Sequence, residues 1–226
     1  MIKGITYTDH RMTISAQRCV DSMLMNGVDE VKIYGPDDID HYFYQANYCT
    51  LNQDKGAGLW LWKPYIIWTE LLKLNDGDIL IYSDAGVEFI NDVRLVINDM
   101  TGDLLTFEGT EPHIKWCKKK VLEFFHIGEE EARKMVQLQS SVIYVKRSDR
   151  ATIFISEWLR YCQNESLLND VLEVEYDDFI EHRHDQAILS CMGDIQRLWW
   201  STDYKNNPGD TYLMFKHHRK RNTDYK

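Results

Sequence analysis

Asp84 is the residue whose position in this chain most clearly suggests chemistry. It follows an uninterrupted apolar run, 79–82, which is typical of a strand buried on both faces. Its neighbours Ser83, Ala85 and Gly86 are small, so a ligand can approach the backbone closely. Ligands of α/β sheets bind at the carboxyl ends of the strands. A carboxylate there can hold a divalent cation or cap a turn, and the residues alone leave both interpretations open.

A glycine-spaced loop with two lysines precedes this strand and contains Lys55, Gly56, Gly58 and Lys63. Backbone N–H groups and ammonium groups of such a loop can contact phosphate oxygens. Within the loop, tryptophans alternate with leucines over residues 59–62, so the two indole rings share one face if the segment is extended. We favour core packing for these rings over stacking on a sugar.

Two further clusters of polar residues lie in the C-terminal part of the chain. His182, His184, Asp185 and Gln186 open a predicted helix, where a carboxylate is stabilised by the helix dipole, so Asp185 can be a simple helix cap. The segment 216–221 (KHHRKR) is a basic island near the C-terminus, and it is either a disordered tail or part of a site. The DGD sequence at 76–78 also pairs two carboxylates, and we interpret it as the turn before a strand.

The elements that must position these residues alternate between strands and helices. The pattern predicts strands at 2–8, 31–34, 79–82, 104–107 and 141–146, and helices at 12–26, 65–74, 93–100, 152–163 and from 185, with a helix or turn at 37–47. The helix at 65–74, entered through Pro64, is the clearest amphipathic one. This order predicts a single α/β domain of 226 residues with a mostly parallel sheet.

Composition excludes several classes of protein. A formal net charge of −10 argues against nucleic-acid binding, which requires a basic face. The N-terminus contains no signal-peptide core and no run is long enough to span a bilayer, so we expect a soluble, cytoplasmic protein. The odd number of scattered cysteines, without a C-x-x-C pair, predicts free thiols rather than disulfides or a zinc knuckle: Cys19, Cys49, Cys117, Cys162 and Cys191.

The blocks GAGLWLWKPYII and GDILIYSDAG, followed about a hundred residues later by HRHDQAIL, resemble small GT-A-type glycosyltransferases of bacterial surface-polysaccharide clusters and large DNA viruses. The resemblance covers most of the chain, including YTDH near the start and HHRKR near the end. It implies a GT-A-like, Rossmann-like sheet flanked by helices. Residues 1–100 would bind the nucleotide sugar, residues 101–215 would form the acceptor side, and residues 216–226 would be a basic tail.

The resemblance also implies roles for individual residues. Asp84, with His217 or His218, would hold Mn²⁺ or Mg²⁺, and Asp185 would face the sugar or act as general base beside His184. The remaining nucleotide-sugar contacts would come from Thr6, Tyr7, Lys55, Gly56, Gly58, Lys63, Ala85, Gly86, Gln186 and Arg219. Gly86 stands where the usual Asp-x-Asp signature has its second aspartate, a form that is common in the resembling family, so only Asp84 carries over. One departure from the family pattern is Lys55, which stands where arginine is more common.

The sequence therefore predicts a metal-dependent, hexosyltransferase-type enzyme. It would move a sugar from a nucleoside diphosphate, with uridine as the expected base, to a glycan acceptor. A carbohydrate-binding module without catalysis is the main alternative. A metal-dependent phosphohydrolase fits less well, because it requires several converging carboxylates or histidines and only Asp84 stands at this strand end.

Overall fold

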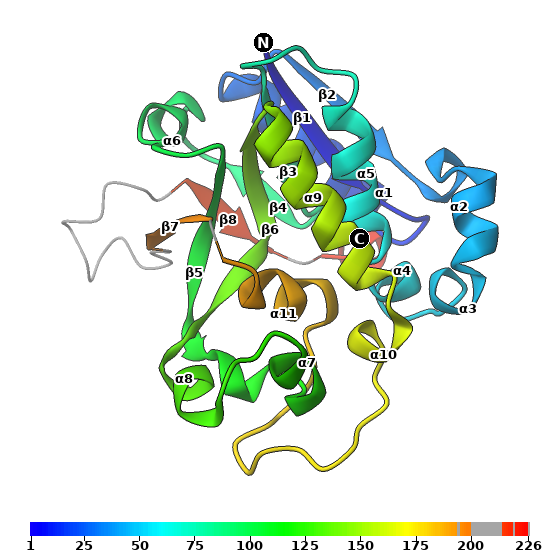
Figure 1. Cartoon of the computed structure of the whole chain (residues 1–226). Helices are drawn as coiled ribbons and strands as arrows, with labels where there is room; N and C mark the ends of the chain where they lie inside the picture. The colour runs from blue at the N-terminus through cyan, green and yellow to red at the C-terminus, as the bar shows by residue number, and fades with distance from the viewer. Residues whose placement is uncertain (194, 200–213, 219, 226) are drawn as a thin grey trace.

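A six-stranded sheet forms the centre of the computed structural model, which describes residues 1–193, 195–199, 214–218 and 220–225 (Figure 1). The strands are β1 (Ile2–Tyr7), β2 (Glu30–Tyr34), β3 (Ile79–Ser83), β4 (Val87–Phe89), β5 (Leu104–Pro112), β6 (Val136–Lys146), β7 (Gln196–Trp199) and β8 (Phe215–His217). The order in the main sheet is β2-β1-β3-β6-β5-β7, and β4 pairs with β8 in a separate ribbon. Five strands of the main sheet run in one direction, and β6 runs antiparallel to both of its neighbours. The sheet is therefore mixed, with most of its strands in the predicted parallel direction.

Helices cover both faces of this sheet. They are α1 (Thr13–Met25), α2 (His41–Ala46), α3 (Tyr48–Leu51), α4 (Gly56–Leu59), α5 (Trp62–Leu71), α6 (Arg94–Asn98), α7 (Lys119–Phe124), α8 (Glu129–Lys134), α9 (Asp149–Cys162), α10 (Glu165–Leu168) and α11 (His184–Cys191), with 3-10 turns η1 (Pro36–Asp38), η2 (His113–Lys115) and η3 (Asn222–Tyr225). In Figure 1, α7 and α8 lie below the sheet, at the same end as the segment that leads from α10 to α11. No helix in the described part of the chain is both long and apolar enough to cross a bilayer.

The buried apolar side chains form two hydrophobic cores, and strand β3 contributes to both. Leu80 and Tyr82 pack into the core that α5, α9 and α11 share, while Ile79 and Ile81 pack into the core of α1, β4 and β8. Successive side chains of a strand point to opposite faces, so an unbroken apolar run fits a sheet covered on both sides. The burial of this strand confirms the prediction for residues 79–82.

Helix α5 differs from its prediction. It begins at Trp62 rather than at residue 65, and it is buried nearly all round, including the polar side chains of Lys63 and Glu70. The amphipathic assignment is wrong because α5 contacts both β3 and α9. A helix enclosed on two sides has no solvent stripe, so its charged residues must find buried partners.

The described part of the C-terminal segment is folded onto the domain. Strand β8 pairs with β4, and the segment then reaches the start of α1, where the Ser15 hydroxyl donates to the Lys220 carbonyl (2.6 Å). The Asn222 N–H donates to the Arg11 carbonyl (2.9 Å). Of the two alternatives for this tail, the structure supports a segment packed beside the site.

Candidate active site

A cavity of about 550 Å³ opens at the carboxyl ends of β1 and β3, the sheet edge at which the sequence predicts a ligand. Eleven of the predicted site residues line it: Tyr7, Lys55, Gly56, Lys63, Asp84, Ala85, Gly86, His184, Asp185, Gln186 and His217. They come from segments far apart in the chain. The fold therefore gathers the glycine loop, the strand-end carboxylate, the start of α11 and the C-terminal ribbon around one cavity.

Three other predicted residues, Thr6, Gly58 and His218, are not brought to the cavity. Thr6 is fully buried within the sheet. Gly58 is buried beside Leu51. The His218 ring faces Glu88, with Nε2 3.8 Å from the carboxylate, and its Nδ1 accepts from the Lys220 N–H. Arg219 lies outside the described residues. Direct nucleotide contact by Thr6 or Gly58 and metal ligation by His218 thus find no support in this geometry.

The Lys63 ammonium is the centre of the site. Its Nζ lies 3.3 Å from Asp84 Oδ1 and 3.1 Å from Asp185 Oδ2, and it donates to the carbonyl and hydroxyl oxygens of Ser140. The Tyr82 hydroxyl donates to Asp84 Oδ1 (2.5 Å). Lys63 and Asp185 are almost fully buried, whereas the Asp84 side chain is 38% exposed. Of the two carboxylates that contact Lys63, Asp84 is therefore the more accessible to a ligand.

Burial and charge act against each other in this cluster. Burial lowers the pKa of Lys63, but attraction to Asp185 and Asp84 outweighs it, so the net pKa is raised. Burial raises the pKa of Asp185, and the contact with Lys63 offsets this shift only in part. A buried carboxylate whose charge depends on one ammonium is a candidate proton acceptor, and it is sensitive to any change in its partner.

The glycine loop forms a left-handed turn. Residues 56–60 all have positive φ, with values of 60°, 50°, 103°, 52° and 59°. Only glycine adopts this region freely, and a Cβ on Gly58 would lie 2.7 Å from Leu51 Cα. The N–H groups of residues 57–60 donate to carbonyls of residues 54–56. The amides of residues 57–60 are therefore satisfied within the turn and not directed at a phosphate, and Gly58 serves the shape of the turn.

This turn also separates the two tryptophans. Trp62 stacks on Tyr7 (ring centroids 3.8 Å apart), whereas the Trp60 ring lies 5.2 Å from the His184 ring. The extended conformation in which both rings share a face is therefore not adopted. Both tryptophans and their ring partners nonetheless line the cavity, so two ring pairs form part of its wall.

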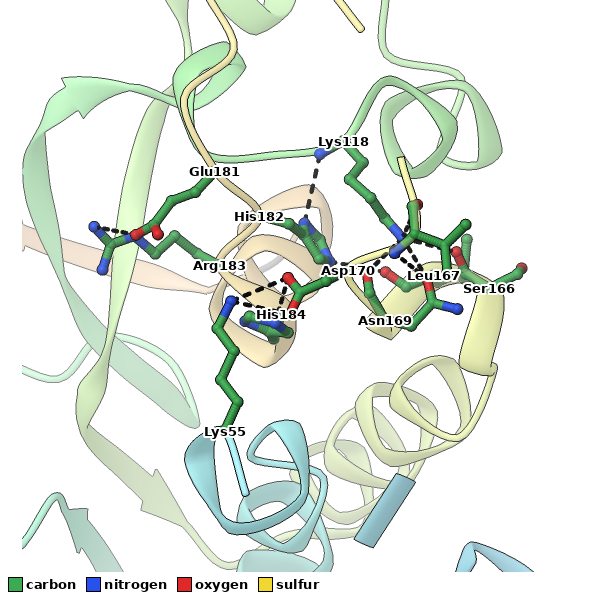
Figure 2. Close-up of polar contacts among 11 residues, drawn as sticks. Lys55, Lys118, Ser166, Leu167, Asn169, Asp170, Glu181, His182, Arg183 and His184 are labelled. Carbon is green, nitrogen blue, oxygen red and sulfur yellow. Dashed lines mark hydrogen bonds and ion pairs between the residues drawn. The ribbon is translucent and has the colours of Figure 1, made fainter. Parts of the chain in front are cut away.

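Asp170 joins two of the predicted residues in a network that Figure 2 shows. The Lys55 Nζ lies 3.0 Å from both oxygens of Asp170, and His184 Nε2 lies 3.1 Å from one of them. Burial lowers the pKa of His184 to about 4 despite Asp170, and it lowers that of His182 well below its ordinary value. Both imidazoles are thus neutral at neutral pH, and neither supplies positive charge to a phosphate.

Several cavity residues were missed by the sequence reasoning. Tyr82 was detectable, because it lies on β3, two residues before Asp84, which follows the strand. Asp9 and Arg11 follow β1 directly and form an ion pair at the cavity wall. Ser140 comes from β6, whose antiparallel register against β3 has no local signal. The turn interpretation of the DGD segment is confirmed, since Asp78 accepts from the Asn75 N–H (3.0 Å).

The site fits a hard divalent cation in composition. Asp84 and His217 both line the cavity, whereas no third histidine, cysteine or carboxylate joins Asp84 in a preassembled cluster among the described residues. Mg²⁺ sites of this type use one or two carboxylates and complete their coordination with substrate phosphates and water. The residues present would hold such an ion together with its substrate rather than alone.

No protein-family model and no curated protein sequence matches this chain. Solved structures do. A glycosyltransferase involved in the glycosylation of the major capsid of PBCV-1 aligns over 96% of this chain and 92% of its own, with 12% identity and a TM-score of 0.52. Mouse xyloside xylosyltransferase 1 aligns over 96% and 97%, with 8% identity and a TM-score of 0.51. The chain has a GT-A glycosyltransferase fold. At these identities the similarity establishes the fold alone, and the GT-A fold predicted from the sequence is confirmed.

Proposed function

We propose that this protein transfers a sugar from a nucleoside-diphosphate sugar to a glycan acceptor, with Mn²⁺ or Mg²⁺ bound at Asp84. The observation that carries the proposal is the cluster of Asp84, Lys63 and Asp185 in a cavity at the sheet edge of a GT-A fold. Uridine is the base we expect. The Tyr7 ring, stacked on Trp62 at the end of β1, offers a surface for it.

The charge balance of the cavity supports a metal requirement. Its described lining contains five basic and five acidic side chains, namely Arg11, Lys55, Lys63, Arg183 and Arg221 against Asp9, Asp54, Asp84, Glu181 and Asp185. Leaving the histidines out of the count, the lining is therefore formally uncharged. A diphosphate brings negative charge that this lining does not balance, so an added divalent cation is favourable.

The residues of the chain take distinct roles in this proposal. A bound cation would neutralise the diphosphate as it leaves, and Asp84 and His217 would hold that cation. The Tyr82 hydroxyl and Lys63 fix the Asp84 carboxylate from its buried side, which leaves the exposed side for the ligand. Arg221, on the C-terminal segment, lines the same cavity and is placed to contact phosphate.

Asp185 is proposed to act on the sugar or on the acceptor hydroxyl. Its carboxylate lines the cavity while one oxygen lies against Lys63. Its raised pKa suits a group that takes up a proton from the acceptor. Gln186 lies next to it, with its amide held by Gln137 (3.0 Å), and would contact the donor sugar in this proposal.

Turnover measurements test this proposal. Release of nucleoside diphosphate from uridine-, guanosine- and thymidine-linked sugars is measured with Mn²⁺, with Mg²⁺ and with chelator. We expect turnover of one donor class that chelator abolishes and that Asp84→Asn and Asp185→Asn reduce by a factor of about 100 or more. Asp76→Asn, in the turn before β3, is the matched control and should leave the rate unchanged.

A carbohydrate-binding protein without catalysis is the second candidate. The observation that favours it is the Lys63 ammonium 3.3 Å from Asp84, since that charge already compensates the carboxylate and opposes a second cation. This candidate predicts sugar binding that is insensitive to chelator and to Asp84→Asn, with no release of nucleoside diphosphate from any donor. Such a result would replace the transferase proposal.

A further inference from the structure

Three nitrogen and sulfur metal ligands meet outside the cavity, at the C-terminal end of α11. His113 Nε2 lies 3.2 Å from Cys191 Sγ, and the sulfur atoms of Cys117 and Cys191 are 3.9 Å apart. All three ligand atoms lie within 4.8 Å of one another. His113 and Cys117 are buried, and Cys191 is partly exposed. The ligands come from η2, the loop after it and the last residue of α11.

The separations match those around a tetrahedral zinc ion. With Zn–S near 2.3 Å and Zn–N near 2.1 Å, tetrahedral angles place neighbouring ligand atoms roughly 3.6 to 3.8 Å apart. The observed 3.2 and 3.9 Å lie on either side of this range, so shifts of a few tenths of an ångström would bring these two pairs to it. The third pair, His113 and Cys117, lies within 4.8 Å. A disulfide requires its sulfurs about 2.0 Å apart, and it would leave the imidazole without a role.

We propose that His113, Cys117 and Cys191 form a zinc site. Two thiolates and an imidazole select Zn²⁺ over the hard cations that carboxylates and phosphates bind. The group contains no fourth such ligand among the described residues, so water or a small exogenous ligand would take the fourth position. Zinc binding displaces the protons of both thiols, and these are released to solvent.

The proposed zinc site lies at the C-terminal end of α11. Helix α11 carries His184 and Asp185 at its start and Cys191 at its end, about 9 Å further along at 1.5 Å per residue. A zinc ion would therefore link the C-terminal end of this helix, which also carries Asp185, to η2 and to the loop after η2. The sequence does not reveal this site, because Cys191 lies 74 residues beyond Cys117 and no short ligand motif links them.

Cobalt substitution in the full chain without a metal-binding tag tests the proposal. Reduced protein is titrated with Co²⁺ without oxygen, and the thiolate-to-cobalt charge-transfer absorption is recorded. We expect saturation at one Co²⁺ per chain, displacement by Zn²⁺, and loss of the band in Cys117→Ser and in Cys191→Ser. Asp84→Ala should keep the band, which separates this site from the cation site proposed in the cavity.

Controls make the outcome decisive. Cys49→Ser removes an exposed thiol and Cys162→Ser a buried one, and both should retain the band. If the serine variants of the cluster do not fold, alkylation of the wild-type protein replaces them. Zn²⁺ should then slow modification of Cys191 but not of Cys49. Absence of a charge-transfer band in the wild type, its persistence in both cluster variants, or alkylation of Cys191 unaffected by Zn²⁺ would overturn the proposal.

Discussion

Lys63 shows how one buried side chain organises the candidate site. Its ammonium is enclosed by two carboxylates and the oxygens of Ser140, and it lies 5.2 Å from the Tyr82 ring centroid. A buried cation is stable only when such partners offset its lost hydration. The position of Asp84 was predictable from its strand, because that signal is local. The partnership with Lys63 was not, because it depends on α5 being enclosed by α9.

Replacing Lys63 with methionine should be strongly destabilising. Methionine fills similar volume, but it leaves the buried Asp185 carboxylate without its counter-charge, and breaking such a pair costs about 3 to 5 kcal/mol. Urea unfolding measures this cost. The matched control is Lys120→Met, which removes an exposed, solvent-screened ion pair with Glu173 and should change the stability far less. Equal costs for the two variants would contradict a buried charge pair.

His184 should make stability depend on pH. Burial lowers its pKa from 6.5 to about 4, so between these values the unfolded chain binds a proton that the folded chain does not. Stability is therefore lost as pH falls from 6.5 towards 4, by up to about 3 kcal/mol from this residue. The free energy of unfolding of His184→Asn should fall less steeply over this range.

Asparagine suits this test because it tolerates the positive φ of 45° at this position. The matched control is His126→Asn, at an exposed histidine with φ of 58°. That variant should follow the wild-type pH profile. If His184→Asn also follows it, the imidazole is not held neutral by burial.

At the scale of elements, the left-handed turn at 56–60 is the feature furthest from its prediction. The glycine spacing correctly indicated an unusual loop beside the cavity, and Lys55 and Gly56 do line it. The spacing did not indicate that the amides of the turn are satisfied internally, since that follows from the φ angles of five successive residues. The ion pair of Lys55 with Asp170 was equally hidden, because 115 residues separate them.

Gly58→Ala tests whether the glycine is required for backbone shape. The new Cβ would meet Leu51 Cα at 2.7 Å and the residue would keep a φ of 103°, so we expect a loss of about 3 kcal/mol in urea unfolding. Gly77→Ala is the matched control, since Gly77 has a φ of 88° and no atom within 4 Å of the added Cβ. It should cost only about 1 kcal/mol. A Gly58 variant as stable as the Gly77 variant would argue against this packing.

At the scale of the whole molecule, strand alternation predicted the α/β architecture well. The three strands β2, β1 and β3 are parallel as expected, and their carboxyl ends form the edge at which the cavity opens. The reversed direction of β6 was not predictable, because α7 and α8 intervene between it and β5 and no turn signal marks the pairing. The antiparallel strand nonetheless matters for the site, since it supplies Ser140 to Lys63.

The measurement that tests the central claim most directly is nucleotide-sugar binding with and without Mn²⁺. Binding is detected as a change in the melting temperature of the wild type and of Asp84→Ala. A ligand that binds only the folded state raises the melting temperature. We predict that one nucleotide class raises it in the wild type only when Mn²⁺ is present, and that Asp84→Ala removes this dependence. A shift of equal size without Mn²⁺ or in Asp84→Ala, or no shift with any nucleotide sugar, would contradict a metal-dependent donor site at Asp84.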